Sequence, residues 1–306
     1  MKKTVLYILI TAFCFGTMEV ALKIGATGMD AVQLTFLRFL IGGLLLLPIG
    51  LADIKKRGVT LTKGDYKWLF EVGLMGVTIS MLAFQFGVAR CNAATAAALI
   101  CMNPLFTMVL AHLFTEEKMN DNKVKACLIG LVAAFFMIRP WDMQAGNTVM
   151  GVGLVLFASL TFGAYTVMGK RSVARIGSFM QTAVSFIFGA LALLVMLVVT
   201  GRPIVAGVAE NWFVVVYVGI VVTGIGYLAY FSAIARSDAS TGAIAFYIKP
   251  AIAPILAVLL LEESVYWNSI VGIALLMSAS VLILKDATQA KAERAQSALP
   301  SGVKVR

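Results

Sequence analysis

The chain has 306 residues, of which 60% are hydrophobic and only 13% are charged, about half the charged share of an ordinary soluble domain. So few charges cannot cover the surface of a water-soluble protein, and the composition therefore indicates an integral membrane protein. Lys and Arg outnumber Asp and Glu by 25 to 15, but they fall in short clusters between long apolar runs, which is typical of membrane topology and excludes a basic surface that binds nucleic acid.

A helix needs about 20 mainly apolar residues to cross the ~30 Å hydrocarbon core of a bilayer. In chain order the apolar runs predict ten such helices, at residues 4–24, 31–51, 67–88, 93–114, 123–140, 147–169, 179–200, 211–234, 241–261 and 267–284. The connections are short and leave no room for a soluble domain. The start, Met1-Lys2-Lys3 before an apolar run, is also how a signal peptide begins. This run continues to Lys23, however, and is interpreted as the first helix.

The distribution of Lys and Arg predicts the orientation. With the N-terminus in the cytoplasm, nineteen of the 25 basic residues lie on the cytoplasmic side, four lie outside, and Arg38 and Lys249 lie within spans. Positive residues concentrate in cytoplasmic loops. The expected location is therefore the cell (inner) membrane, with both termini cytoplasmic. A polar cytoplasmic tail at 286–306 is expected to be mobile.

Two halves of the chain, predicted at 1–144 and 145–285, resemble each other at an offset of 146 residues. The offset aligns 89–97 with 235–243, Gly73 with Gly219, Pro104 with Pro250, Glu116-Glu117 with Glu262-Glu263, and Asn122 with Asn268. Near the start the offset is 147, which aligns Phe15-Gly16 with Phe162-Gly163 and Lys23 with Lys170. Because the offset spans five helices, an odd number, the halves must cross the membrane in opposite directions. Inverted repeats of this kind are typical of secondary transporters.

Several of these residues also form motifs. They are Phe15-Gly16-Thr17 with Lys23, Leu37-Arg38-Phe39-Leu40, the Ala-x-Arg-x-x-Ala element after the third helix, and the Pro-to-Glu-Glu stretches of the fourth and ninth helices. Together they resemble the EamA-type drug/metabolite transporters over about residues 4–284. Position 15 is Phe where that family often has Trp, and Glu19 is an acid where apolar or small polar residues are commoner.

The resemblance implies an all-α membrane protein of ten helices, arranged as two inverted five-helix halves. Helices 1–4 and 6–9 would surround a central cavity, with helices 5 and 10 at the periphery. Family members export amino acids, sugars, nucleotide precursors and drugs, so the resemblance leaves the substrate open.

Two polar residues are predicted near the midplane of the membrane. Lys249 lies about 12 Å inside the ninth helix and Asn103 roughly 15 Å inside the fourth. They are equivalent at the offset of 146, and each precedes a proline, Pro104 or Pro250, that kinks its helix. Interrupted helices with an amide and an ammonium at mid-depth suit a polar solute. Because a midplane lysine costs ~2.5–3.5 kcal/mol, Lys249 is predicted to face the cavity and bind substrate or an acidic partner. For Pro104 a plain kink is the alternative.

Glu19 lies about 8 Å from the outer end of the first helix, and three interpretations of it stay open. It can pair with Lys23 one turn further on, or with Arg38 at a similar depth on the second helix. It can instead face the cavity and bind a cationic group or a coupling proton. If Glu19 and Lys249 both reach the cavity, this acid and base suit a zwitterion such as an amino acid.

Further side chains are candidates for the cavity wall. Gln85 near the outer mouth and the tyrosines Tyr227, Tyr230 and Tyr247 can offer polar groups to a substrate, although tyrosines also occur at the lipid interface. The single histidine, His112, excludes most multi-histidine metal chemistry. Four scattered cysteines indicate neither a disulfide framework nor a zinc site. We therefore expect no metal and no cofactor.

These features favour a secondary transporter, and specifically an exporter, of a small polar organic metabolite such as an amino acid, working by alternating access in a lipid bilayer. The alternative is a multidrug exporter of lipophilic cations that uses Glu19. A membrane enzyme would need clustered carboxylates, a His-rich motif or a Gly-rich phosphate loop. A channel would need polar rings along its whole pore. Whether the protein is a monomer or a homodimer is left open.

Overall fold

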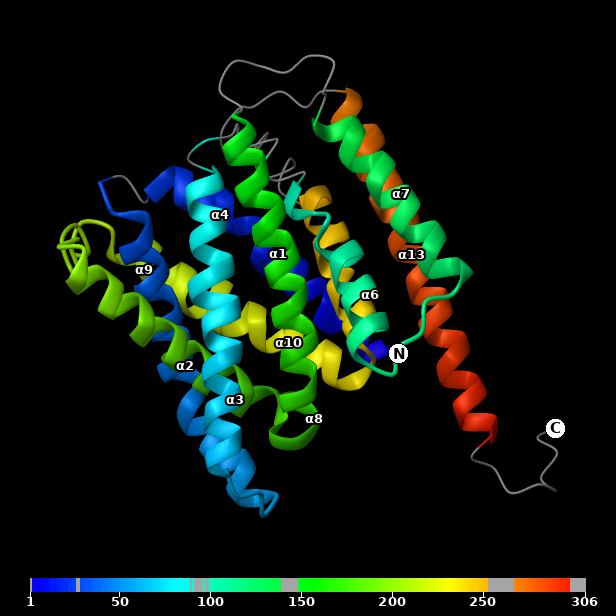
Figure 1. Cartoon of the computed structure of the whole chain (residues 1–306), viewed down its shortest axis with the longest axis horizontal. Coiled ribbons are helices and arrows are strands. Elements are labelled where there is room, and N and C mark those ends of the chain that lie inside the picture. The colour runs from blue at the N-terminus through cyan, green and yellow to red at the C-terminus, as the bar shows by residue number, and fades with distance from the viewer. Residues whose placement is uncertain are drawn as a thin grey trace.

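A computed structural model describes residues 2–25, 28–88, 90, 96, 99–138, 148–252 and 267–297, and the side chains of 19, 20, 22–25, 269 and 290–297 lie outside this description. In chain order its helices are α1 (Lys2–Gly25), α2 (Ala31–Lys56), α3 (Lys63–Gly73), η1 (Leu74–Ser80), α4 (Met81–Val88), α6 (Asn103–Phe114), α7 (Asp121–Ile138), α8 (Val149–Val199), α9 (Trp212–Tyr217), η3 (Val218–Ile225), α10 (Gly226–Arg236), α11 (Ala239–Ala243) and α13 (Trp267–Ser297). The two η segments are π-helical. Within the described residues no strand occurs, so the described fold is all-α (Figure 1).

Five helical segments in the described part of the chain are long and apolar enough to cross a membrane. They are Ala31–Lys56, Lys63–Val88, Val149–Val199, Trp212–Arg236 and Ile270–Gln289. Two of them are composite, because η1 joins α3 to α4 and η3 joins α9 to α10 without a break. These segments make the protein a multi-pass membrane protein, as the composition predicted. The count of ten spans stays a prediction.

The longest helix, α8, has 51 residues, about 76 Å at 1.5 Å per residue and more than twice the ~30 Å bilayer core. Gly177 interrupts it with φ +84°, a conformation that residues with a Cβ rarely adopt, and the chain turns back there (Figure 1). The sequence predicted a connection between spans ending at 169 and starting at 179. That connection is instead helical on both sides of a turn made by one glycine.

The helices α7 and α13 lie side by side along one edge of the molecule (Figure 1). Small residues of α7, Ala126 and Ala133, are fully buried. The last helix is longer than predicted, because α13 continues past residue 284 as far as Ser297. Alanine is frequent between Asp286 and Ser297 and has the highest helix propensity.

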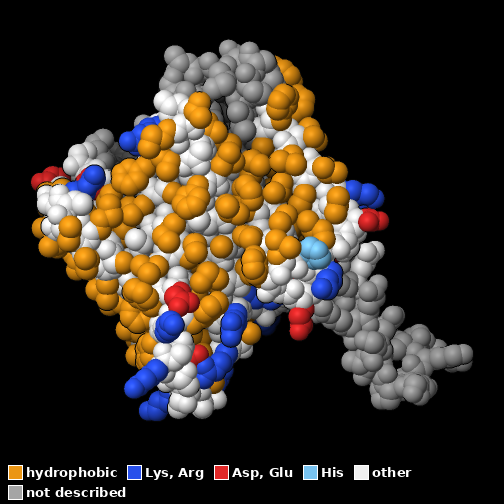
Figure 2. Space-filling model, viewed as in Figure 1, with side chains coloured by type: hydrophobic (Ala, Val, Ile, Leu, Met, Phe, Trp, Pro, Cys, Tyr) orange, Lys and Arg blue, Asp and Glu red, His pale blue; other side chains and the backbone are white. Residues whose placement is uncertain are grey.

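The outer surface of the helices is apolar. Large side chains such as Leu113, Phe135 and Val195 are more than half exposed. Figure 2 shows apolar side chains over most of the visible face, with charged side chains at its lower end and edges. Such a surface would aggregate in water, and lipid chains are its natural solvent.

Candidate functional site

A small cavity lies between helices from both halves of the chain. Its lining is Phe15 and Met18 of α1, Met81 and Phe84 of α4, Ile100, Phe162 of α8, Tyr227 of α10, and Phe246 and Lys249 of the helical stretch after α11. The cavity measures about 30 Å³, which is room for a water molecule or two. Ligand pockets start at about 300 Å³. An organic substrate therefore needs a more open conformation of this site.

Aromatic rings from both halves close the cavity. The ring centres of Phe15 and Tyr227 lie 4.8 Å apart, those of Phe162 and Phe246 5.1 Å, and those of Phe15 and Phe246 5.5 Å. Tilted and edge-on pairs at such distances contribute about 0.5–1.5 kcal/mol each. The cluster is therefore stable without a bound substrate, and it must separate when one enters.

Lys249 is the charged member of this lining and is only 4% exposed. Its helix bends before it, because α11 ends at Ala243 and Ile244 forms a turn, after which the helical conformation continues through Pro250 to Ile252. The interruption thus lies at Ile244, and Pro250 stands within the helical stretch that follows it. On α1, Gly16 faces this stretch, since a Cβ there would lie 3.1 Å from the Ile252 side chain.

Asn103 is fully buried, but it does not line the cavity in this conformation. Its amide donates to the carbonyl of Ser159 at 3.1 Å and accepts from the Thr107 hydroxyl at 3.3 Å. The helix before it is interrupted at Cys101-Met102, and α6 starts at Asn103 with Pro104 in its first turn. The Ile100 carbonyl, which loses its partner at Pro104, accepts from the Ser159 hydroxyl at 3.4 Å. Here Asn103 therefore joins α6 to α8.

The other candidates lie around the cavity rather than in its lining. The amide of half-buried Gln85 donates to the Thr35 hydroxyl at 3.2 Å. The Tyr230 hydroxyl is fully buried and lies 2.7 Å from the hydroxyl of Thr166. The side chain of Glu19 lies outside the described residues, and its three interpretations stay open.

Arg38 is a buried cation, as expected for a structural residue. Its guanidinium donates to the Thr223 hydroxyl at 3.3 Å and to the Met81 thioether at 3.2 Å. It also lies 4.3 Å from the centre of the Phe39 ring, within range of a cation–π interaction. Arg38 therefore contacts Met81, a residue of the cavity wall, without lining the cavity itself.

A second polar cluster, which we call the inner latch, joins three helices on the side predicted to be cytoplasmic. Its centre is Glu117, which follows α6 and has a side chain only 8% exposed. Lys170 of α8 pairs with it at 2.5 Å, and Lys123 of α7 lies at 3.8 Å. The first residues of α11 complete the latch, because the Ala239 N–H donates at 2.8 Å and the Ser240 hydroxyl at 2.8 Å.

The latch holds one carboxyl charged and disfavours the charge on another. Burial alone would raise the pKa of Glu117, but Lys170 and the hydrogen bonds from Ala239 and Ser240 hold that pKa below its ordinary value. Burial and the nearby Glu117 carboxylate raise the pKa of Asp238, the N-cap of α11. Of the two carboxyl groups, Glu117 therefore carries the negative charge that stabilises the inner latch.

Sequence reasoning did not single out the apolar part of the wall, Met81, Phe162 and Phe246, or the partners of Glu117. The repeat offset held a signal for the wall, because these residues align with Tyr227, Phe15 and Ile100, which also line the cavity. In the part of the chain that the structure describes, no group of three or more His, Cys, Asp or Glu side chains could hold a metal ion.

The sequence and the helical fold match known proteins. The model of the EamA-like transporter family matches the chain twice, over residues 2–139 and 149–285. The chain belongs to the EamA-like transporter family. Its members are transporters and not enzymes, which removes the membrane-enzyme alternative.

Individual relatives agree with this family. An uncharacterized transporter of Clostridium kluyveri is 36% identical over 289 residues, covering 92% of this chain and 93% of that protein. The pseudopaline exporter CntI of Pseudomonas aeruginosa is 24% identical over 249 residues, covering 81% and 84%. A solved crystal structure has a TM-score of 0.73 at 19% identity and covers 94% of this chain and 98% of that one, so it shows the shared fold alone.

Proposed function

We propose that the protein is a secondary transporter that exports a small polar organic metabolite, such as an amino acid, across the cell membrane. The observation that carries this proposal is Lys249, a buried cation in a closed cavity built from both halves of the chain. An intramembrane charge in such a place marks a solute pathway. Export as the direction is supported by the relative CntI, which is named an exporter.

We further propose ten spans in two inverted five-helix halves, with the cavity on their pseudo-twofold axis. Three pairs of cavity residues support this arrangement, because Phe15 with Phe162, Met81 with Tyr227, and Ile100 with Phe246 are equivalent at an offset of 146 or 147. A site on the axis is expected to be lined by equivalent residues. Lys249 breaks the symmetry, since its equivalent Asn103 lies outside the lining.

Contacts far from the cavity support the same axis. Asn122 at the start of α7 donates to Asp286 in the second half of α13, at 3.3 Å. Its equivalent Asn268, at the start of α13, donates to the Phe136 carbonyl near the end of α7, at 3.2 Å. The two asparagines are equivalent, and each joins the start of its own helix to a later part of the other, so α7 and α13 run antiparallel.

The inner latch gives alternating access a physical basis. On the side predicted to be cytoplasmic it ties Glu117 to Lys170 and to the start of α11. The repeat assigns Glu117 to Glu263, Lys170 to Lys23 and Ala239-Ser240 to Ala93-Ala94. We infer that these equivalents form an outer latch in the opposite state. Glu263 and the segment 91–95 lie outside the described residues, as does the side chain of Lys23.

A second candidate function is supported by the character of the wall. The lining includes four aromatic rings, Phe15, Phe162, Tyr227 and Phe246, and aromatic rings also suit a lipophilic cation. In that case Glu19 would bind the positive charge, and Lys249 would be held away from the substrate by a partner.

Two substitutions distinguish these candidates. A carrier of anions or zwitterions should lose transport in Lys249→Met and retain part of it in Glu19→Gln, measured in proteoliposomes with amino acids and with lipophilic cations. A cation exporter should show the reverse order. Binding is found first by thermal stabilisation of the purified protein against a metabolite and drug library. Wild-type transport in both variants would contradict both assignments.

A further inference from the structure

A pocket separate from the Lys249 cavity lies where the start of α3 meets α8 just before the turn at Gly177. We call it the Trp68–Arg171 pocket. It measures about 340 Å³ and is lined by Thr62, Gly64, Asp65, Trp68, Leu69, Arg171, Ser172, Arg175 and Ile176. This end of the molecule carries loops rich in Lys and Arg, which the sequence predicts to be cytoplasmic. In Figure 2 charged side chains gather at this end, below the apolar surface.

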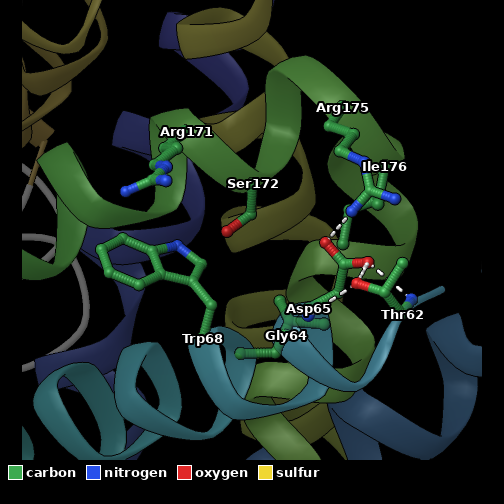
Figure 3. A pocket seen from close by; sticks show the side chains of 9 residues that line it. Thr62, Gly64, Asp65, Trp68, Arg171, Ser172, Arg175 and Ile176 are labelled. Atoms are coloured by element: carbon green, nitrogen blue, oxygen red, sulfur yellow. Dashed lines mark hydrogen bonds and ion pairs between the residues drawn. The ribbon is translucent and has the colours of Figure 1, made fainter.

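Ser172 gives the pocket an unused hydrogen-bond donor. The residue is 6% exposed, and among the described residues its buried hydroxyl has no hydrogen-bond partner. Figure 3 shows its side chain pointing from α8 into the pocket, toward Trp68. A buried hydroxyl without a partner is unfavourable, so a ligand that accepts from Ser172 would recover that loss.

Arg171 adds a positive charge that no described carboxylate neutralises. Its guanidinium lies 4.9 Å from the centre of the Trp68 ring, a cation–π contact that holds the side chain at the pocket. Within the described residues Arg171 takes part in no ion pair. The N–H donors of its planar guanidinium can therefore bind an anion, and phosphate and carboxylate groups match their geometry.

The one acid in the lining is already occupied. The Asp65 carboxylate pairs with Arg175 and accepts from the backbone N–H and the hydroxyl of Thr62, each at 2.6 Å (Figure 3). Two arginines against one aspartate leave the pocket with a net positive charge. The first turn of α3 lies in the same wall, and the N–H groups at a helix start favour anions.

We propose that the Trp68–Arg171 pocket binds a phosphate group. Arg171 would take two of its oxygens, Ser172 would donate to a third, and Trp68 would cover the apolar side of the molecule that carries the phosphate. That molecule is an anionic phospholipid headgroup or a free phosphate compound from the cytoplasm. Tryptophan at the membrane interface and basic residues toward the cytoplasmic leaflet suit the lipid source.

The test measures Tm of the delipidated full-length protein in neutral detergent with phosphatidylglycerol, with phosphatidylcholine and with inorganic phosphate. We expect phosphatidylglycerol to raise Tm and the shift to be lost in Arg171→Gln and reduced in Ser172→Ala. The matched control is Arg236→Gln, an exposed arginine at the end of α10 that lies 5.4 Å from the centre of the Tyr7 ring. Its shift should equal that of the wild type.

The arms of the test separate the two sources of phosphate. A shift with phosphatidylglycerol alone identifies the lipid headgroup, and a shift with inorganic phosphate as well identifies a free phosphate compound. Arg171→Lys keeps the charge without the fork and should give a partial shift, which guards against a loss of folding in Arg171→Gln. No shift with any of the three additives, or equal shifts in Ser172→Ala, both Arg171 variants and Arg236→Gln, would overturn the proposal.

Discussion

At the scale of single residues, the central question is the role of the buried Lys249. Lys249 lies in a cavity too small for an organic molecule, beside aromatic rings that have to part. Its charge is costly at that depth, and a substrate anion is the group that would use it. Asn103, its equivalent in the first half, is occupied by Ser159 and Thr107 instead. The two halves have therefore given one pair of positions different roles.

The substitution Lys249→Ala separates a binding role from a structural one. If Lys249 binds substrate, its removal abolishes transport but leaves Tm unchanged or higher, because the desolvation cost of the charge disappears. If it neutralises a buried acid, its removal strands that charge at a cost of roughly 3–5 kcal/mol, and the yield of folded protein falls. Tm and proteoliposome uptake, measured on the same preparation, give the answer. Lys249→Arg should transport poorly, since a planar fork does not replace a point donor.

Asp238 makes a prediction about pH. Its pKa in the folded protein is raised above the ordinary value of about 3.9, so ionisation of Asp238 works against the fold. That cost is absent at low pH and appears as the pH rises through the raised pKa. In the wild type the Thr241 N–H donates to the Asp238 carboxylate at 2.6 Å. The side-chain oxygen of Asn at this position can accept the same hydrogen bond. We expect Asp238→Asn to raise Tm at about pH 7.5 and to change it little at about pH 4. An equal loss of Tm at both pH values would mean that the carboxylate itself stabilises the fold.

At the scale of helices, α2 and α8 form a fixed pair. Arg57 at the end of α2 donates to the Ile176 carbonyl at 2.5 Å, and Asp30 at its start pairs with Arg202 at 2.8 Å. Between these ends, Gly43 brings the two backbones together, since a Cβ there would lie 3.1 Å from the Ala183 carbonyl oxygen. Because contacts hold the two helices together at both ends, we expect them to move as one unit. The moving parts are therefore expected among α6, α7 and α11, which the inner latch joins to the first half of α8.

The turn at Gly177 is expected to tolerate no side chain. A Cβ there would lie 2.6 Å from the Arg57 guanidinium, and the positive φ is strained for any residue with a Cβ, by roughly 1–2 kcal/mol. Gly177→Ala should therefore lower Tm by several degrees. Gly153 of the same helix is the control, because a Cβ there meets nothing within 4 Å. Gly153→Ala should leave Tm unchanged or slightly raised, and equal effects of the two substitutions would refute a special role for the turn.

At the scale of the whole molecule, the sequence predicted the membrane setting, the family and the position of Lys249 in the cavity lining. Long apolar runs were sufficient for the membrane setting, and the motifs carried the resemblance to the family. The position of Lys249 followed from its depth in the predicted ninth helix and from the offset of 146. Glu117 was recognised only as half of a repeated acid pair, because Lys170 and Ser240 come near it only after folding. The Gly177 turn and the long α13 were missed for a different reason. The connection predicted between residues 169 and 179 is replaced by a turn at a single glycine. The tail after residue 285 is polar by composition, but its alanine-rich first part folds as a helix.

Distances between spin labels across the two ends of the molecule test alternating access most directly. One pair, Ala174→Cys with Arg236→Cys, reports on the inner side, and the roughly equivalent pair Gly28→Cys with Arg90→Cys reports on the outer side. Glu117→Gln weakens the inner latch, and the matched control Glu116→Gln changes the exposed acid next to it. The account predicts that Glu117→Gln lengthens the inner distance and shortens the outer one, while Glu116→Gln changes neither. Inner and outer distances that change independently, or in the same direction, would contradict alternating access between inverted halves.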